Sequence, residues 1–388
     1  MGDGLMFTLI RNAHVFAPED LGQKDLLICN DRIIAVEDHI DFAWDPAETE
    51  EINAAEKYLV PGFIDQHVHI IGGGGEDGFA SLIPELQMTD CVRYGVTTVV
   101  GLLGTDGTAK SVRALVAKTK ALKEQGISAY CLTGSYAYPP VTVTGSVAGD
   151  IAFIDEVLGV KIAISDHRSS NISADELAYL ATQARTAGLL AGKPGILHMH
   201  TGRGKKGLSD VIRIVEETDI PVSQFRPTHC GNQYEDAVKF AHMGGYIDFT
   251  SGPETAQNAA VLSKALHEVP VKQVTLSSDS NGSFPKWSED KKIIGMGIGR
   301  TETLYATIRH LIKDASLDVN MSDALSLITS NVAEGLGLYP RKGAVRKGSD
   351  ADLVMLDQDL NVTDVMARGA FMMRSGEVCA KNYYDDIR

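Results

Sequence analysis

Eight short apolar segments alternate with helical patterns through the middle of the chain, and this alternation constrains the fold most strongly. Patterns such as Lys110–Gln125 and Ser173–Ala187 have helical periodicity. Short apolar runs between helices are typical of buried parallel strands. The alternation predicts an α/β fold, a (β/α)8 TIM barrel, with a doubly wound open sheet as the alternative. The apolar segments are Gly62–His69, Thr97–Leu103, Ser128–Gly134, Gly159–Ser165, Gly195–His200, Arg226–His229, Tyr246–Thr250 and Gln273–Ser278.

The two ends of the chain have a different pattern, because they consist of short β segments without helices between them. These segments are Phe7–Ile10, Asp25–Ile28 and Arg32–Val36 near the start, and Ala351–Leu356, Val362–Ala367 and Phe371–Arg374 near the end. We therefore expect residues 1–58 and 343–388 to form one small β-sheet domain together. Residues 59–342 would then form the barrel.

Charge and cysteine content narrow the classes of function. The 388 residues include 51 acidic and 36 basic side chains, a net charge of -15, which argues against binding to nucleic acid or to anionic membranes. No apolar run is long enough for a transmembrane helix, and the start of the chain lacks the pattern of a secretory signal. The five cysteines are scattered and odd in number, which predicts free thiols and a cytoplasmic location.

The first predicted barrel strand ends in His67-Val68-His69, and this spacing indicates a metal site. Residues i and i+2 of a strand face the same way, so the two imidazoles could chelate one ion. Without further ligands, two histidines at this spacing are as often ordinary polar residues on the edge of a strand as they are metal ligands. In a TIM barrel, however, the carboxyl ends of the strands meet at one mouth. The other predicted strands bring Lys161, His200, His229 and Asp279 to that mouth, and His198 would lie one layer deeper.

Lys161 and Asp279 suggest how such a site would work. Burial of Lys161 within its strand would lower the pKa of its amine, and a neutral lysine can react with carbon dioxide to form a carbamate that bridges two metals. Two metals would make hydroxide available at neutral pH, and Asp279 could accept its proton and pass it to a leaving amine. The non-catalytic alternative for Lys161 is a buried aliphatic chain whose ammonium group reaches water. The non-catalytic alternative for Asp279 is an ordinary aspartate in a polar turn.

This distribution of ligands over the strands resembles that of the amidohydrolase superfamily with a binuclear metal centre. Residues Lys342–Val354 resemble the segment by which that superfamily returns into its small β-sandwich, which implies that residues 1–58 and 343–388 form a β-sandwich domain. The resemblance to the bacterial isoaspartyl dipeptidase family is closer and covers nearly the whole chain. The segments that carry it are Pro61–His69, Gly72–Glu76, Gly101–Asp106, Ile164–Ser169 and Leu276–Asp279.

The resemblance implies a homo-oligomer that hydrolyses dipeptides in which aspartate is joined through its side-chain carboxyl. It implies two Zn²⁺ ions per subunit, bridged by carboxylated Lys161, with His67, His69, Lys161, His200, His229 and Asp279 as metal ligands. Asp279 would act as general base and acid, and Tyr136 would stabilise the oxyanion of the scissile carbonyl. Glu76 would hold the α-amino group and Arg168 a carboxylate. The remaining substrate contacts would come from Gly74, Thr105 and Ser283.

One position departs from the family. Asn232 stands where the family has an arginine that grips a substrate carboxylate. Arg226, Arg203 or Arg300 would compensate, or the preferred substrate differs. We also expect a loop over the mouth within Phe284–Arg300.

Three other functions remain open from the sequence. Two are enzymes of the same superfamily: a cyclic-amide hydrolase of the dihydroorotase or hydantoinase type, and an N-acyl amino acid hydrolase. The third is a catalytically inactive scaffold. The filled set of ligand positions argues against the scaffold, and the glycine run with Glu76 argues against the cyclic-amide hydrolases.

Overall fold

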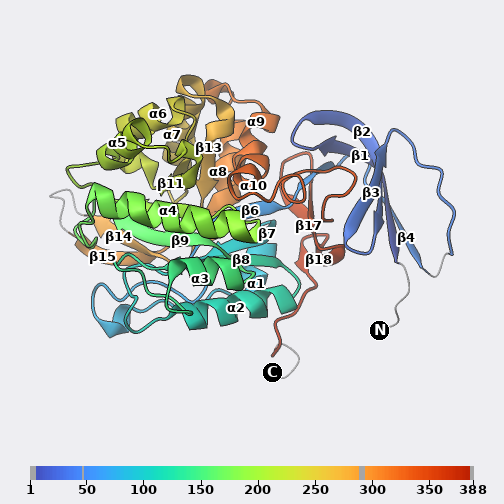
Figure 1. The fold of residues 1–388 in the computed structure, drawn as a ribbon. Helices are drawn as coiled ribbons and strands as arrows, with labels where there is room; N and C mark the ends of the chain where they lie inside the picture. The colour runs from blue at the N-terminus through green and yellow to red at the C-terminus, as the bar shows by residue number, and fades with distance from the viewer. Residues whose placement is uncertain (1–5, 46–47, 288–292, 385–388) are drawn as a thin grey trace.

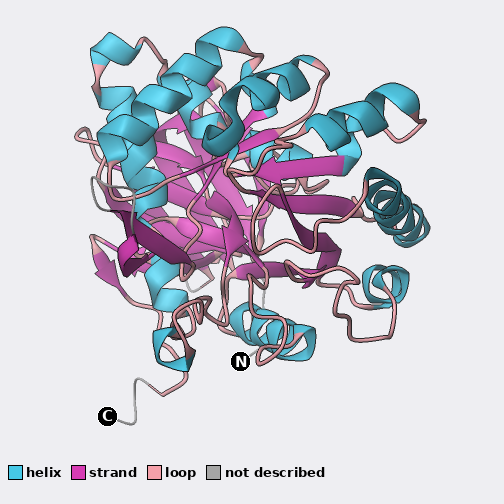
Figure 2. Ribbon diagram, turned by 90° about the vertical axis from the view of Figure 1, so that its left-hand side faces the viewer, coloured by secondary structure: helices cyan, strands magenta, loops and turns pink. Residues whose placement is uncertain are grey.

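The computed structural model describes residues 6–45, 48–287 and 293–384. Its centre is a ring of parallel strands surrounded by helices (Figure 2). The strands β6 to β11 form one hydrogen-bonded sheet in chain order, and β12 pairs with β13 in parallel. The bounds are β6 Phe63–Val68, β7 Val96–Gly101, β8 Ser128–Gly134, β9 Val157–Ile164, β10 Ile196–Thr201, β11 Phe225–Thr228, β12 Ile247–Thr250 and β13 Val274–Ser277.

The ring closes through contacts between the last strand and the first. Val68 and Ser280 form a parallel bridge, and the amide of His69 donates to the carbonyl of Ser280 at 2.9 Å. At the gap between β11 and β12, Thr228 Oγ1 donates to Asp248 Oδ2 at 2.7 Å. The prediction of a TIM barrel is therefore confirmed, and the open sheet is excluded.

The helices cover the outside of the ring. The capping box of Ser173 and Glu176 begins α4, and Gly192, with φ of 65°, ends it. None of the described helices combines the length and the hydropathy that a membrane span requires. The α-helices are α1 Met88–Val92, α2 Val112–Glu124, α3 Val147–Phe153, α4 Ala174–Ala191, α5 Ser209–Glu217, α6 Tyr234–His242, α7 Thr255–Glu268, α8 Glu302–Lys313, α9 Met321–Ser326 and α10 Ser330–Gly335. Short 3-10 helices are η1 Phe79–Ser81, η2 Val222–Gln224, η3 Cys230–Gln233, η4 Val271–Gln273 and η5 Ala315–Leu317.

The two ends of the chain share one nine-stranded sheet beside the barrel (Figure 1). Its strand order is β19-β18-β17-β16-β5-β1-β2-β3, and β4 also pairs with β1. The antiparallel pairing of β5 with β16 joins the N-terminal half to the C-terminal half. The bounds are β1 Phe7–Phe16, β2 Asp20–Cys29, β3 Arg32–Glu37, β4 Thr49–Asn53, β5 Tyr58–Pro61, β16 Leu353–Leu356, β17 Val362–Ala367, β18 Ala370–Arg374 and β19 Glu377–Val378.

The strand β16 shows how this sheet is packed on both faces. Leu353 and Met355 belong to the apolar cluster inside the terminal unit, whereas Val354 and Leu356 belong to the cluster shared with the barrel helices. This alternation is the two-residue period of a strand. The division into residues 1–58 with 343–388 and residues 59–342 stays a prediction, and the pairing of the terminal sheet continues to Pro61.

A β-hairpin occupies most of the segment expected to be a loop over the mouth. Strands β14 (Ser283–Trp287) and β15 (Ile293–Ile298) pair antiparallel. Residues 288–292, at the tip, lie outside the described residues. The segment expected to be a loop over the mouth therefore has regular strand pairing along its two arms.

Candidate metal centre and active site

A cavity of about 1180 Å³ opens where the carboxyl ends of the barrel strands meet. Its walls include His69, Tyr136, His200, His229 and Asp279, which come from five different strand ends. These residues were predicted from the sequence as metal ligands or catalytic groups. The fold thus brings together side chains that are up to about two hundred residues apart in the chain, as is usual for this architecture.

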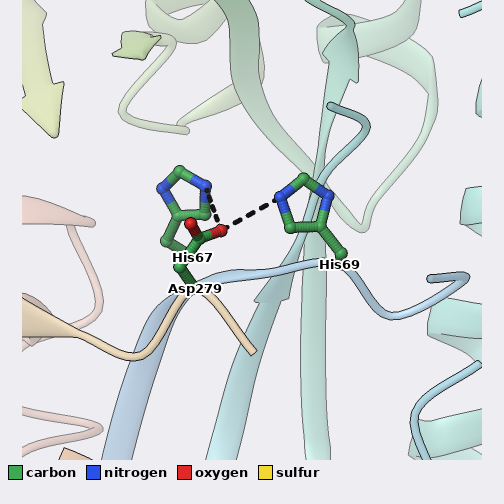
Figure 3. A group of neighbouring side chains, drawn as sticks. All are labelled: His67, His69 and Asp279. Atoms are coloured by element: carbon green, nitrogen blue, oxygen red, sulfur yellow. Dashed lines mark ion pairs between the residues drawn. The ribbon is translucent and has the colours of Figure 1, made fainter. Parts of the chain in front are cut away.

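His67, His69 and Asp279 form a cluster of potential ligands (Figure 3), and His69 and Asp279 line the cavity. Nε2 of His67 lies 3.3 Å from Oδ1 of Asp279, and Nε2 of His69 lies 3.1 Å from the same oxygen. The ligand atoms of the three residues are all within 4.8 Å of one another. Two imidazoles and a carboxylate on one side of a cavity form a donor set that suits zinc.

The unpaired polar atoms of this region test whether a metal fits. Buried atoms without a hydrogen-bond partner in the described structure include His67 Nε2, His69 Nδ1, Lys161 Nζ, His229 Nε2 and Asp279 Oδ1. Leaving a buried polar atom unpaired costs about 1–3 kcal/mol, so native proteins rarely accept several together. Their concentration around one cavity fits residues that are built to bind cations.

Supporting contacts orient two of the imidazoles. Nε2 of His198 lies 3.1 Å from Nδ1 of His67, and Thr250 Oγ1 lies 2.6 Å from Nδ1 of His229. Such contacts on one ring nitrogen direct the other toward a metal. His198 thus lies behind His67, one layer deeper, where the sequence placed it. Thr250 was missed, although it ends the seventh apolar segment.

Burial shapes the protonation of the same groups. Burial lowers the pKa of His67 and His229 well below the usual value, so both imidazoles are neutral at pH 7. Burial also lowers the pKa of Lys161 to about 7, with Asp279 and Asp248 opposing the shift. Although burial alone would raise the pKa of Asp279, its contact with His69 and the nearby His229 and Lys161 side chains hold it below its usual value.

The backbone turns sharply at two of these strand ends. His229, with φ of 61°, and Asp279, with φ of 52°, are both in the left-handed region, which is rare for residues other than glycine. Gly282 leaves space for the site, because a Cβ there would lie 2.6 Å from Oδ1 of Asp279 and 2.8 Å from the His69 ring. Such local strain clusters at functional sites.

His200 differs from the other predicted ligands because both of its nitrogens have partners. Tyr136 Oη lies 2.7 Å from Nδ1, and Asp166 Oδ2 lies 2.9 Å from Nε2. The ring packs against His229 with centroids 4.6 Å apart. The structure therefore places His200 beside the cluster but aims no unpaired nitrogen into it. Asp166 had no predicted role, although its position directly after the fourth strand was an available signal.

The predicted substrate contacts converge around Glu76. Oε1 of Glu76 accepts hydrogen bonds from Ser283 Oγ at 3.0 Å, from Thr105 Oγ1 at 3.1 Å and from Arg168 Nη1 at 3.3 Å. Two bonds of 2.9 Å join Arg168 to Asp166. Gly74 lines the same cavity. The structure thus brings together the groups that the sequence assigned to the substrate.

Asn232 lines the cavity, and both polar atoms of its side chain form hydrogen bonds. Its Oδ1 accepts a hydrogen bond from Arg203 Nε at 3.0 Å, and its Nδ2 donates to the carbonyl of Thr201 at 3.1 Å. Arg203 also lines the cavity. Of the three arginines considered from the sequence, Arg203 is therefore the one that the structure places at the site.

Arg226 cannot compensate for Asn232. It is buried, and its guanidinium donates to the carbonyls of Ser223, Phe225 and Gly335. This part of the prediction is wrong because a side chain inside the strand points between strand and helix, not into the mouth. Arg300 is not among the described residues that line the cavity.

Comparison with known proteins decides the family. The model of the amidohydrolase family matches residues 58–376, which is most of the chain. The chain belongs to the amidohydrolase family. A solved β-aspartyl dipeptidase of Fervidobacterium islandicum, in complex with a β-Asp-Leu dipeptide, is 38% identical to this amidohydrolase. The match covers 97% of this chain and 100% of that one, with a TM-score of 0.91.

Other relatives of this amidohydrolase are more distant. A dihydroorotase of Listeria monocytogenes is 27% identical over 219 residues, which is 55% of this chain and 49% of that protein. The match thus spans about half the length of that curated relative. An L-hydantoinase of Paenarthrobacter aurescens is 21% identical and matches 91% of this chain and 86% of its own length. The solved β-aspartyl dipeptidase, at 38% identity over 97% of this chain, therefore confirms the resemblance to isoaspartyl dipeptidases that the sequence predicted.

Proposed function

We propose that this amidohydrolase is a metal-dependent isoaspartyl dipeptidase. The observation that carries the proposal is the pairing of Glu76 with Arg168 at 3.3 Å, on the wall of the cavity that His69 and Asp279 of the ligand cluster also line. The likeness to a β-aspartyl dipeptidase over the whole chain supports it.

The substrate chemistry fits this wall. A β-aspartyl dipeptide has an ammonium and a carboxylate on one carbon atom, and an isopeptide carbonyl two bonds away. Glu76 offers the negative charge for the ammonium, and Arg168 offers the positive charge for a carboxylate. Thr105 and Ser283, both within 3.1 Å of Glu76, add neutral hydrogen-bonding groups and fix the carboxylate in place.

The proposed cofactor is a pair of Zn²⁺ ions held by His67, His69, Lys161, His200, His229 and Asp279. Lys161, with its pKa lowered to about 7 by burial, would supply the neutral amine that a carbamate requires. For His200 to bind, its ring must release Tyr136 or Asp166. When bound, the ions would polarise the carbonyl and supply hydroxide at neutral pH.

The side chains of this chain would do the remaining work. Asp279 would accept the proton of the attacking water and deliver it to the leaving amine. Burial raises the pKa of Tyr136 well above its usual value, so its phenol stays protonated and would donate to the carbonyl oxygen as charge develops there.

The proposal is tested by offering zinc-loaded protein a panel of β-Asp-Leu, α-Asp-Leu, β-Asp-amide, N-acetyl-leucine, hydantoin and dihydroorotate. We expect turnover of β-Asp-Leu and none of α-Asp-Leu, because only the β-linked amide places its carbonyl at Tyr136 when the ammonium is at Glu76. Turnover of a cyclic amide alone would assign the protein to the hydantoinase type. A protein that takes up no zinc would fit the inactive scaffold.

The scattered cysteines support a cytoplasmic location, and the resemblance supports a homo-oligomer, whose size analytical ultracentrifugation of the full chain would measure. The net charge of -15 supports small-molecule substrates over nucleic acid.

A further inference from the structure

We propose that Arg203, positioned by Asn232, determines specificity by binding the C-terminal carboxylate of the residue that leaves the substrate. This inference rests on the proposed function, because it concerns the second carboxylate of a β-aspartyl dipeptide. At neutral pH such a dipeptide has one ammonium and two carboxylates. A site that holds all three charges needs one acidic group and two cations.

The cavity supplies these cations from two arginines. Arg168 and Arg203 are the Lys or Arg side chains among its described lining residues. Arg168 is held by two hydrogen bonds to Asp166 and lies 3.3 Å from Glu76. It is therefore placed for the carboxylate on the same carbon atom as the ammonium. The second carboxylate is left to Arg203.

The guanidinium of Arg203 is held at one nitrogen, and its other two nitrogens are free to bind a ligand. Its Nε donates to Asn232 Oδ1 at 3.0 Å, and its two terminal nitrogens have no hydrogen-bond partner in the described structure. The side chain is exposed, so its charge is retained without a compensating carboxylate. A guanidinium fixed at Nε keeps Nη1 and Nη2 free for a two-point contact with a carboxylate.

The turn that carries Arg203 is fastened on both sides. Toward β9, the amide of Gly202 donates to Ile164 at 3.1 Å and that of Gly204 donates to Ser165 at 2.6 Å. A Cβ at either glycine would lie 2.5 Å from the Ser165 carbonyl, so only glycine allows this approach.

Toward η3, neighbouring side chains hold the same turn. Gln233 Nε2 donates to the carbonyls of Gly202 and Gly204 at 3.0 Å each. Asn232 Nδ2 donates to the carbonyl of Thr201. An arginine on so restrained a turn loses little conformational freedom on binding, which favours a specific contact over a mobile surface charge.

The test compares β-Asp-Leu with its C-terminal amide, which lacks the second carboxylate. Arg203→Gln should lower kcat/KM for β-Asp-Leu by about 10- to 100-fold, the value of one charged hydrogen-bond pair, and leave the amide unchanged. Asn232→Ala should raise the KM for β-Asp-Leu by a smaller factor with kcat retained, because Arg203 keeps its charge but loses its anchor. Arg203→Lys should rescue only part of the loss.

Lys205→Gln is the matched control, because Lys205 is an exposed cation two residues away that does not line the cavity. It should leave both substrates unchanged. Equal losses of Arg203→Gln on the acid and the amide, or no loss on either, would overturn the inference.

A wild-type protein that cleaves neither substrate would contradict the proposed function, and binding then decides the inference separately. Calorimetric titration with N-acetyl-leucine and N-acetyl-leucinamide should show that the wild type prefers the acid and that Arg203→Gln loses this preference. Absence of the preference in the wild type would overturn the role of Arg203.

Discussion

Asp166 joins two groups of the active site, since its Oδ2 lies 2.9 Å from Nε2 of His200 and accepts a hydrogen bond from Nη2 of Arg168 at 2.9 Å. One carboxylate therefore positions a proposed metal ligand and a proposed substrate-binding arginine. The pKa of Asp166 is held well below its usual range: burial opposes this shift, but the hydrogen bonds from Arg168 and His200 outweigh it. It remains charged at any pH at which the enzyme would work.

Asp166→Asn should therefore lower kcat/KM for β-Asp-Leu by about 10- to 100-fold, the usual effect of removing a residue that orients a metal ligand. The change keeps the shape of the side chain but replaces one acceptor by a donor that Arg168 cannot use. We expect both a higher KM and weaker zinc retention, measured by kinetics and by metal analysis after dialysis. Asp175→Asn, at the exposed start of α4, is the control. Wild-type kinetics and zinc content in Asp166→Asn would contradict this role.

Lys161 should carry a carbamate. Its pKa of about 7 lies far below the usual value for lysine because of burial, so the neutral amine that reacts with carbon dioxide becomes abundant as pH rises through 7. Protein equilibrated with ¹³C-bicarbonate and zinc should give a carbamate NMR signal that grows between pH 6 and 8. The signal should be absent from Lys161→Gln and present in Lys110→Gln. An identical spectrum for Lys161→Gln and wild type would refute the carbamate.

Asp248 should be a principal determinant of barrel stability. Its carboxylate accepts hydrogen bonds from Gln66 on β6, Thr228 on β11, and Thr275 and Ser277 on β13. These bonds cross both gaps in the backbone pairing of the ring. Asp248→Ala removes the acceptor of the buried Thr228 and Ser277 hydroxyls, while Gln66 and Thr275 each keep a second acceptor, and it should cost about 2–5 kcal/mol of unfolding free energy.

The measurement is the shift in the urea midpoint of unfolding. Asp248→Asn, which retains one acceptor oxygen, should lose less than Asp248→Ala. Thr228→Val and Gln66→Leu should each lose a smaller amount, since each removes one donor. An unfolding midpoint of Asp248→Ala equal to that of wild type would show that the network does not stabilise the barrel.

Glu156 gives a prediction for acid stability. Burial would raise its pKa, but hydrogen bonds from Lys123 at 2.8 Å and Lys120 at 2.9 Å lower it from 4.5 to about 2. Because the folded-state pKa is depressed, the stabilisation is present above pH 4.5 and is lost as pH falls toward 2. Glu156→Gln should destabilise the protein by about 1–3 kcal/mol at pH 7 and by progressively less below pH 4.5. A difference that is constant from pH 7 to 3 would contradict this account.

The barrel and the metal cluster were predictable because both depend on local patterns. The two-residue spacing of His67 and His69 places them on one strand face. The apolar residues on both sides of Lys161 indicate that its side chain is buried. Strand β4 was not predictable in the same way. Its sequence, Thr49–Asn53, is polar and half exposed, and only pairing with β1 makes it a strand.

The contacts between loops could not be read from the sequence either. Asp166, Arg203 and Asn232 follow three different strands, and only the closed ring brings their loops together. Arg226 lies close to Asn232 in the chain, but its guanidinium is buried against backbone carbonyls away from the mouth. A carboxylate within an apolar strand, as in Ile247-Asp248-Phe249, was a signal of a buried polar network that went unused.

The most direct test of the account is a crystal structure of zinc-loaded Asp279→Asn with β-Asp-Leu bound, because this change removes the proposed proton carrier and should trap the substrate. We predict the ammonium at Glu76, the isopeptide carbonyl within hydrogen-bond distance of Tyr136, and the leucine carboxylate at Arg203. A dipeptide bound in the opposite direction, with its ammonium away from Glu76 and its amide away from Tyr136, would contradict the proposed isoaspartyl dipeptidase.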